Sequence, residues 1–183
     1  NILQFSCRKA EHVIAEILYI TANALSSQSI YSLSNFYLNL AKYLNAEFIS
    51  YDTLLAENFY KTDNLKKAQK IYKNLSKHGE AFHWYSSKQI ARILILEENN
   101  IKALELLKKS YDNLINKKVY ETFDYAEFLK NNEKFKDAIP LYTSIINQVK
   151  KEHPLYPEAT DGRGIAYERI GEWEKAETDF LSS

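Results

Sequence analysis

The sequence predicts an all-α fold of stacked helix hairpins, and three observations carry this prediction. The 183 residues include only four glycines and three prolines, the residues that most often interrupt a helix. Apolar residues recur at the three- and four-residue spacing of a helix nearly from end to end. Small residues recur about every 35 positions, as expected for a repeated structural unit.

Helical periodicity predicts ten helices, each ended by polar or helix-breaking residues. Their expected ranges are 8–26, 29–45, 49–61, 65–77, 82–97, 101–115, 119–131, 135–150, 157–170 and 173–182. Thr62-Asp63-Asn64 and Asn99-Asn100 form polar turns that also cap the helix after them. Gly79 suits a helix C-terminus. Pro154 and Pro157 push the residues before them out of helix, and Pro157 also suits the first turn of the next helix.

Five small residues, here called the anchors, mark the middle of five hairpins. The anchors are Ser34, Ala68, Ala103, Ala138 and Ala176, at separations of 34, 35, 35 and 38 residues. Twelve residues before each anchor lies a second small residue, in order Ala22, Ala56, Ala91, Ala126 and Gly164. Large apolar residues lie nine residues before and four residues after each anchor. Two antiparallel helices approach closely where one side chain is small, and stacking of the next repeat covers the remaining apolar surface.

The last repeat resembles a tetratricopeptide repeat (TPR) in the order and spacing of its residues. The resemblance rests on Gly164, Ala166-Tyr167, Gly171, Trp173, Ala176 and Phe180, and on the stretches 64–72 and 133–142. It implies a right-handed superhelix of about five TPR-like hairpins. The stretch GRGIAYER is also similar to a unit of long bacterial TPR proteins. Two departures are Asn99-Asn100-Ile101, which lacks the glycine of the turn, and Pro140, which lies inside a predicted helix and should bend it.

We expect residues 1–183 to form a single repeat array. The predicted repeats are approximately 8–47, 48–81, 82–117, 118–154 and 155–183. The chain starts at Asn1, contains no methionine and stops seven residues after Ala176. We interpret it as a fragment of a longer protein, with an apolar C-terminal repeat that further repeats or another chain would cover.

The composition and the motifs exclude several kinds of site. Twenty-four basic and twenty-four acidic residues leave no net charge to attract nucleic acid. The most apolar run, 12–25, contains Glu16 and Asn23 and is too short to insert in a membrane. Gly162-Arg163-Gly164 lacks the strand and the Lys-Ser/Thr of a phosphate loop, so close helix packing explains its glycines better.

No catalytic or metal-binding arrangement is predicted. The four histidines show no metal-binding spacing, and Cys7 is the only cysteine. We therefore expect no enzyme activity, no cofactor and no metal in these residues. The sequence predicts a soluble protein and leaves the cytoplasm and the periplasm open as its compartment.

The first helices of the repeats supply the candidate binding surface. TPR proteins commonly bind extended peptides or partner helices along the concave groove that these helices line. The outward positions predicted to line it here are Glu57, Tyr60, Tyr85, Lys88, Arg92, Tyr120, Phe123 and Glu127. Aromatic rings supply rigid contact area, and Lys or Arg pairs with carboxylates.

The leading interpretation is therefore a non-catalytic scaffold that binds a protein or peptide in this groove. One alternative is a structural segment that stacks on further repeats or other chains, including self-association through the exposed C-terminal repeat. Another alternative is the TPR arm of an enzyme whose catalytic domain lies outside these residues.

Overall fold

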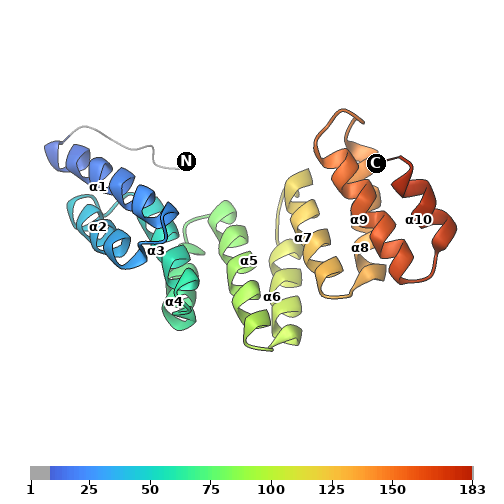
Figure 1. The fold of residues 1–183 in the computed structure, drawn as a ribbon, viewed down its shortest axis with the longest axis horizontal. Coiled ribbons are helices and arrows are strands. Elements are labelled where there is room, and N and C mark those ends of the chain that lie inside the picture. Colours follow the sequence, from blue (N-terminus) through green and yellow to red (C-terminus); the bar gives the residue numbers. More distant parts are fainter. Residues whose placement is uncertain (1–8, 183) are drawn as a thin grey trace. The chain divides into compact units, whose positions relative to one another are not determined.

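A computed structural model describes residues 9–182, and this part of the chain contains ten α-helices and no strand (Figure 1). The helices are α1 (Ala10–Ser27), α2 (Tyr31–Leu44), α3 (Ser50–Lys61), α4 (Leu65–Leu75), α5 (Glu80–Leu96), α6 (Asn100–Asp112), α7 (Val119–Asn131), α8 (Phe135–Gln148), α9 (Leu155–Arg169) and α10 (Trp173–Phe180). The all-α prediction is confirmed, and each of the ten predicted helices is present with small shifts at its ends. Helix α8 continues through Pro140.

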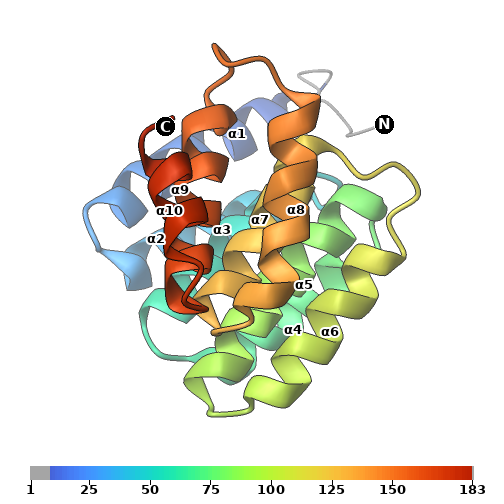
Figure 2. The same ribbon diagram turned by 90° about the vertical axis from the view of Figure 1, so that its right-hand side faces the viewer.

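The chain forms two compact units, 1–97 and 98–183. Unit 1 contains α1 to α5 and unit 2 contains α6 to α10. The boundary falls inside the predicted third repeat, 82–117. In unit 2, α8, α9 and α10 pack side by side (Figure 2). Each unit is described on its own below.

A left-handed residue lies at the same place in the turn of all five predicted repeats, five positions before the anchor. These residues are Ser29, Asp63, Glu98, Glu133 and Gly171, with φ between 58° and 84°. In the turns after α1, α3, α7 and α9, the N–H of the next residue donates to the carbonyl nine residues before the anchor, as in Ile30 to Leu25 at 2.9 Å. This bond, from the third residue after the helix back to its last turn, is the Schellman pattern of helix ends. One local geometry therefore closes each hairpin.

The anchors and their paired small residues are buried, as the close-packing argument requires. The alanines among them are between 0 and 3% exposed. Ser34, the one polar anchor, donates its Oγ proton to the backbone carbonyl of Ala22 across the hairpin at 2.7 Å. The Ser34 hydroxyl therefore takes the place of an alanine methyl group, and its proton has an acceptor although the residue is buried.

The junction between the first two repeats contains a buried polar network centred on Asn58. Asn58 is fully buried on α3, and its Nδ2 donates to Ser34 Oγ and Asn35 Oδ1 on α2, both at 2.8 Å. Its Oδ1 accepts a hydrogen bond from Ser26 Oγ at 2.6 Å. Because both polar atoms of the buried Asn58 amide have partners, the network fixes how α3 meets the first hairpin.

Close packing accounts for the glycines of α9. A Cβ built on Gly162 would lie 2.7 Å from the ring of Tyr142, and one built on Gly164 would lie 2.7 Å from the ring of Phe180. Arg163, between them, binds the carboxylate of Asp179 through Nε and Nη2 at 2.8 and 2.7 Å. The interpretation of this stretch as a packing element is confirmed.

Two local predictions were wrong. Gly79 does not end a helix: it directly precedes α5 with φ of 105°, while α4 already ends at Leu75. Pro157 does not keep Tyr156 out of helix, because α9 begins at Leu155 and contains both residues. Trp173 is 66% exposed at the start of α10. Residues in the described part of unit 2 leave the outer side of this ring uncovered.

Tyr51 gives a direct test of the packing in unit 1. Its ring packs edge-on against Tyr19 and Phe48 with centroids 5.4 and 5.0 Å away, and its buried hydroxyl has no hydrogen-bond partner among the described residues. Burial, followed by the charge of Glu16, raises the pKa of Tyr51 to about 12.

We expect Tyr51→Phe to leave stability unchanged or to raise it by up to about 1 kcal/mol at neutral pH, since an unsatisfied hydroxyl is removed. Because folding raises the pKa of this phenol, ionisation favours the unfolded chain, and the native state loses stability as pH rises from about 10 toward 12. Urea unfolding at pH 7 and pH 11 should therefore show a smaller alkaline loss in Tyr51→Phe than in wild type. An equal loss in both proteins would contradict the assignment.

Candidate functional site

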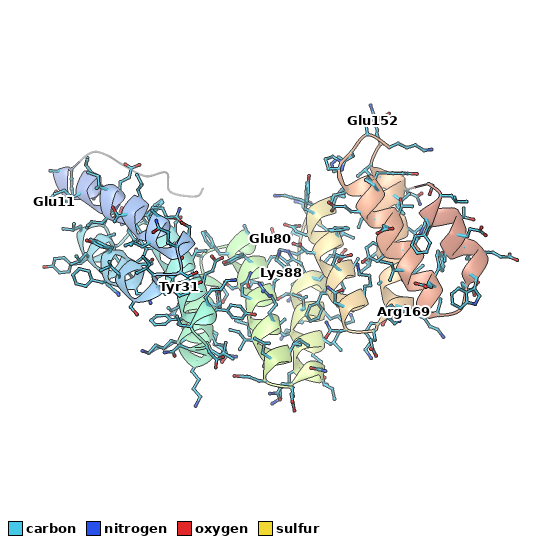
Figure 3. The ribbon with its side chains drawn as sticks, in the orientation of Figure 1. Glu11, Tyr31, Glu80, Lys88, Glu152 and Arg169 are labelled. Carbon is cyan, nitrogen blue, oxygen red and sulfur yellow. The ribbon has the colours of Figure 1, made fainter. Side chains whose placement is uncertain are left out.

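The predicted binding residues of unit 1 lie together on two helices, α3 and α5. Glu57 and Tyr60 are on α3, and Tyr85, Lys88 and Arg92 are on α5, where Figure 3 labels Lys88. We call these five residues the α3–α5 face. Tyr85 Oη donates a hydrogen bond to Glu57 Oε1 at 2.7 Å, which joins the two helices at this point.

The cations of the α3–α5 face lie over aromatic rings. The guanidinium of Arg92 lies 5.1 Å from the centre of the Tyr60 ring, and its Nη1 donates to Gln89 Oε1 at 3.0 Å. Lys88 Nζ lies 5.9 Å from the ring of Trp84. Such cation–ring contacts hold a charged group in position at modest energy, about 0.5–1 kcal/mol at exposed sites.

Burial keeps the phenols behind this face in their neutral, proton-donating form. Burial raises the pKa of Tyr85 well above its usual value, and the hydrogen bond to Glu57 raises it further. Burial and then the charge of Glu57 raise the pKa of Tyr72, whose ring packs edge-on against Tyr85 at 6.0 Å. At neutral pH the face therefore contains one carboxylate, two cations and neutral aromatic donors.

The other three predicted residues, Tyr120, Phe123 and Glu127, lie on α7 of unit 2. Glu127 Oε1 accepts hydrogen bonds from Tyr142 Oη at 2.5 Å and from Lys130 Nζ at 2.6 Å. Phe123 packs edge-on against Tyr142 with centroids 6.2 Å apart. Tyr120, more than half exposed, lies beside His153. On α7, the charge of Glu127 is thus already compensated within the unit.

Glu57 and Glu127 occupy equivalent repeat positions, one residue after the small residue of the first helix, and both accept a hydrogen bond from a tyrosine. The donor is Tyr85 on α5 in unit 1 and Tyr142 on α8 in unit 2. The sequence assigned Tyr142 to packing alone. The one feature of the sequence that could have indicated its hydrogen-bonding role is the tyrosine that recurs four residues after the anchor, at Tyr72 and Tyr142.

The described residues offer no metal site, since they contain no group of three or more His, Cys, Asp or Glu side chains that could hold an ion. His153 has a local role, because its Nδ1 accepts a hydrogen bond from the N–H of Leu155 at the start of α9. In the part of the chain that the structure describes, each helix is too short or too polar to cross a membrane.

Several solved structures are similar to this chain, whereas no protein-family model and no curated protein matches its sequence. One is YrrB, described as a TPR protein with an unusual peptide-binding site, at 16% identity and a TM-score of 0.58 over 95% of this chain and 90% of that one. A putative kinesin light chain with nearly identical TPR-like repeats, from Podosopora anserina, has 13% sequence identity and a TM-score of 0.68, over 91% of this chain and 92% of that one. MamA has 12% sequence identity and a TM-score of 0.62, over 92% of this chain and 89% of that one. At these identities the likeness describes the backbone fold.

Proposed function

We propose that this chain, which has the tetratricopeptide-repeat fold, is a non-catalytic interaction module that binds a peptide or a partner helix. The observation that carries the proposal is the α3–α5 face. Two first helices of consecutive repeats there present aromatic rings and two cations on one surface. The three residues on α7 are proposed as a second contact surface.

The chemistry of the α3–α5 face favours a ligand with a carboxylate beside an apolar or aromatic side chain. Arg92 and Lys88 supply charge-assisted donors to a carboxylate, while Tyr60 and Tyr85 supply rigid contact area that loses little conformational entropy on binding. Glu57 is satisfied by Tyr85, so its charge does less to repel an acidic ligand. A peptide-binding site described for YrrB, which has the same fold at 16% identity, supports a peptide as the ligand.

Peptides selected from a random display library against residues 1–183 provide the test. We expect the selected peptides to bind with micromolar affinity and to be enriched in acidic residues. The double variant Lys88→Glu and Arg92→Glu should weaken binding at least about 30-fold, since two favourable charge contacts become repulsive. Isothermal titration calorimetry measures the change, and circular dichroism checks that the helices are retained.

The matched control is Lys66→Glu with Lys70→Glu, which makes the same change of charge on exposed positions of α4 in the same unit. It should leave peptide affinity within about twofold, because salt in the solution screens surface charges that lie away from the site. Equal losses in both double variants would assign the effect to net charge and sink the proposed site.

Self-association through the C-terminal repeat is the second candidate function, and exposed apolar residues of α10 favour it. Trp173 and Leu181 are largely exposed, and with Phe180 they border a shallow hollow of about 280 Å³. The rim of the hollow contains the carboxylates of Glu168 and Glu177. Two such ends would bring like charges together, so self-association would join this end of one copy to a different surface of the next copy.

A further inference from the structure

The first hairpin, α1–α2, has an apolar outer side that the described residues of unit 1 leave uncovered. On α2, Leu33, Phe36, Leu40 and Tyr43 are 43, 57, 39 and 87% exposed. On α1, Ile14 and Ile17 are about half exposed. We call these six residues the hairpin face.

The same four positions lack large apolar residues in α4, α6 and α8, where all but Pro140 are polar. Counting from the anchor, the positions of Leu33, Phe36, Leu40 and Tyr43 correspond in α4 and the residues after it to Lys67, Lys70, Asn74 and Lys77. In α6 they correspond to Lys102, Glu105, Lys109 and Asp112, and in α8 to Asp137, Pro140, Ser144 and Asn147. All of these are exposed. The fold therefore does not require apolar residues at these positions, and their presence on α2 needs another cause.

The position of Ile17 on α1 is exposed, whereas the equivalent position is buried in the next two first helices. Ile17 lies five residues before the small residue of its helix, and the residues at the same distance in α3 and α5 are Tyr51 and Ser86. Both of those residues are buried within unit 1. Ile17 thus occupies a position that is covered when a neighbouring repeat is present.

The four α2 residues of the hairpin face lie on one side of their helix. At 100° per residue, the spacing of three, four and three places the α2 residues in one stripe. The stretch 13–46 contains only two charged residues, Glu16 and Lys42. Lys42 donates to Asp52 of α3 at 2.6 Å, and Glu16 lies near Tyr51 of α3, whose pKa its charge raises. Both of these charges lie toward α3, so the α2 stripe has none. On α1, Glu11 is exposed three residues before Ile14.

We propose that the hairpin face binds the hairpin face of a second copy of this chain, forming a two-fold symmetric dimer. An uncharged apolar surface is self-complementary, because its own copy brings no unpaired charge into the contact. The three-four-three spacing on α2 is that of a helix–helix seam in which side chains interlock.

The size of the hairpin face is sufficient for such a dimer. At about 150–250 Å² for an aromatic side chain, Phe36 and Tyr43 alone leave roughly 300 Å² of exposed surface, and the four leucines and isoleucines add to it. One partner of a standard interface contributes about 800 Å², including its polar rim. The flanks of the stripe, Ser32, Asn35 and Asn39, are uncharged, whereas a helix that lies on an anionic membrane typically has Lys or Arg there.

Sedimentation velocity of residues 1–183 at concentrations up to about 100 µM tests the proposal. Wild type should be dimeric. A variant that copies α4 onto α2, with Leu33→Lys, Phe36→Lys, Leu40→Asn and Tyr43→Lys, should be monomeric, with a dimer dissociation constant raised at least about 100-fold. The single change Phe36→Lys, which is milder for folding, should raise it about 10-fold. Far-ultraviolet circular dichroism confirms that each variant is folded.

Two further variants identify the surface. Lys67→Glu with Lys70→Glu, at the matched exposed positions of α4, should remain dimeric, and so should Trp173→Glu in the C-terminal repeat. A monomeric wild type at the highest concentration would overturn the proposal. Dissociation by Trp173→Glu, or species that grow beyond a dimer, would assign the contact to the C-terminal end. Binding of a monomeric wild type to vesicles of phosphatidylcholine and phosphatidylserine would assign the face to a membrane.

Discussion

Replacing Asp179 by alanine is expected to destabilise unit 2 by about 3 kcal/mol, the largest single effect in this structure. Both carboxylate oxygens of Asp179 accept hydrogen bonds from Arg163, at 2.7 and 2.8 Å. The third nitrogen, Nη1, donates to Thr143 on α8 at 3.1 Å, so one side chain ties together α8, α9 and α10. The Asp179 and Arg163 side chains are only 5 and 18% exposed.

The cost arises from the charge that would be left behind. The hydrogen bond to Asp179 raises the pKa of Arg163 above its ordinary value, and arginine stays charged in any case, so the variant buries an uncompensated cation. Urea unfolding measures the loss. The double variant Arg163→Met and Asp179→Leu should recover most of it, because the charge and its partner are both removed.

Asp112→Ala is the matched control, since Asp112 also forms a helical ion pair, with Lys108 at 2.6 Å, but on an exposed surface. It should cost less than about 1 kcal/mol. If Asp112→Ala and Asp179→Ala were equally damaging, the burial argument would be wrong.

The second large effect is expected at Gly162, where alanine should cost about 2 kcal/mol. The added Cβ would lie 2.7 to 2.9 Å from the ring and hydroxyl of Tyr142. Tyr142 is fully buried, and its hydroxyl is held by Glu127, so the ring cannot turn aside without losing that bond. Overpacking of about 1–3 kcal/mol then exceeds the gain of up to about 1 kcal/mol that alanine brings to a helix.

Gly164→Ala provides the comparison on the same helix. Its Cβ would approach the ring of Phe180 equally closely, but that ring is partly exposed near the end of the described chain and can rotate outward. The two effects should then nearly cancel, leaving stability within about 1 kcal/mol of wild type. Thermal unfolding of the two variants measures the difference, and equal stability would contradict the packing argument.

Much of the fold was predictable because its determinants are local. The polar turns at 62–64 and 99–100 and the buried anchors Ala68, Ala103 and Ala138 lie where the periodicity placed them. The left-handed turn residues were not predicted. Glu98 and Glu133 adopt a conformation that charged residues rarely take, so their own identity gave no signal, and only their fixed distance from the anchor could have revealed them.

The positions of the candidate site were predictable, but its partners were not. Helical spacing placed Tyr60 and Arg92 on outward faces, and the structure brings them into contact. That Glu127 would bind Tyr142 depends on how closely α7 and α8 approach, and that Arg163 would bind Asp179 depends on how closely α9 and α10 approach. The apolar face of α2 is evident only once exposure is known, because apolar residues in a helix are normally assigned to the core.

Site-specific photo-crosslinking tests the central claim, binding at the α3–α5 face, most directly. Benzoylphenylalanine would replace Tyr60 on that face in one variant and Lys70 on α4 in another, and each would be irradiated with a selected peptide. We predict a covalent peptide adduct from position 60 and none from position 70. Adducts from position 70 alone, or equal adducts from both, would contradict the proposed binding surface.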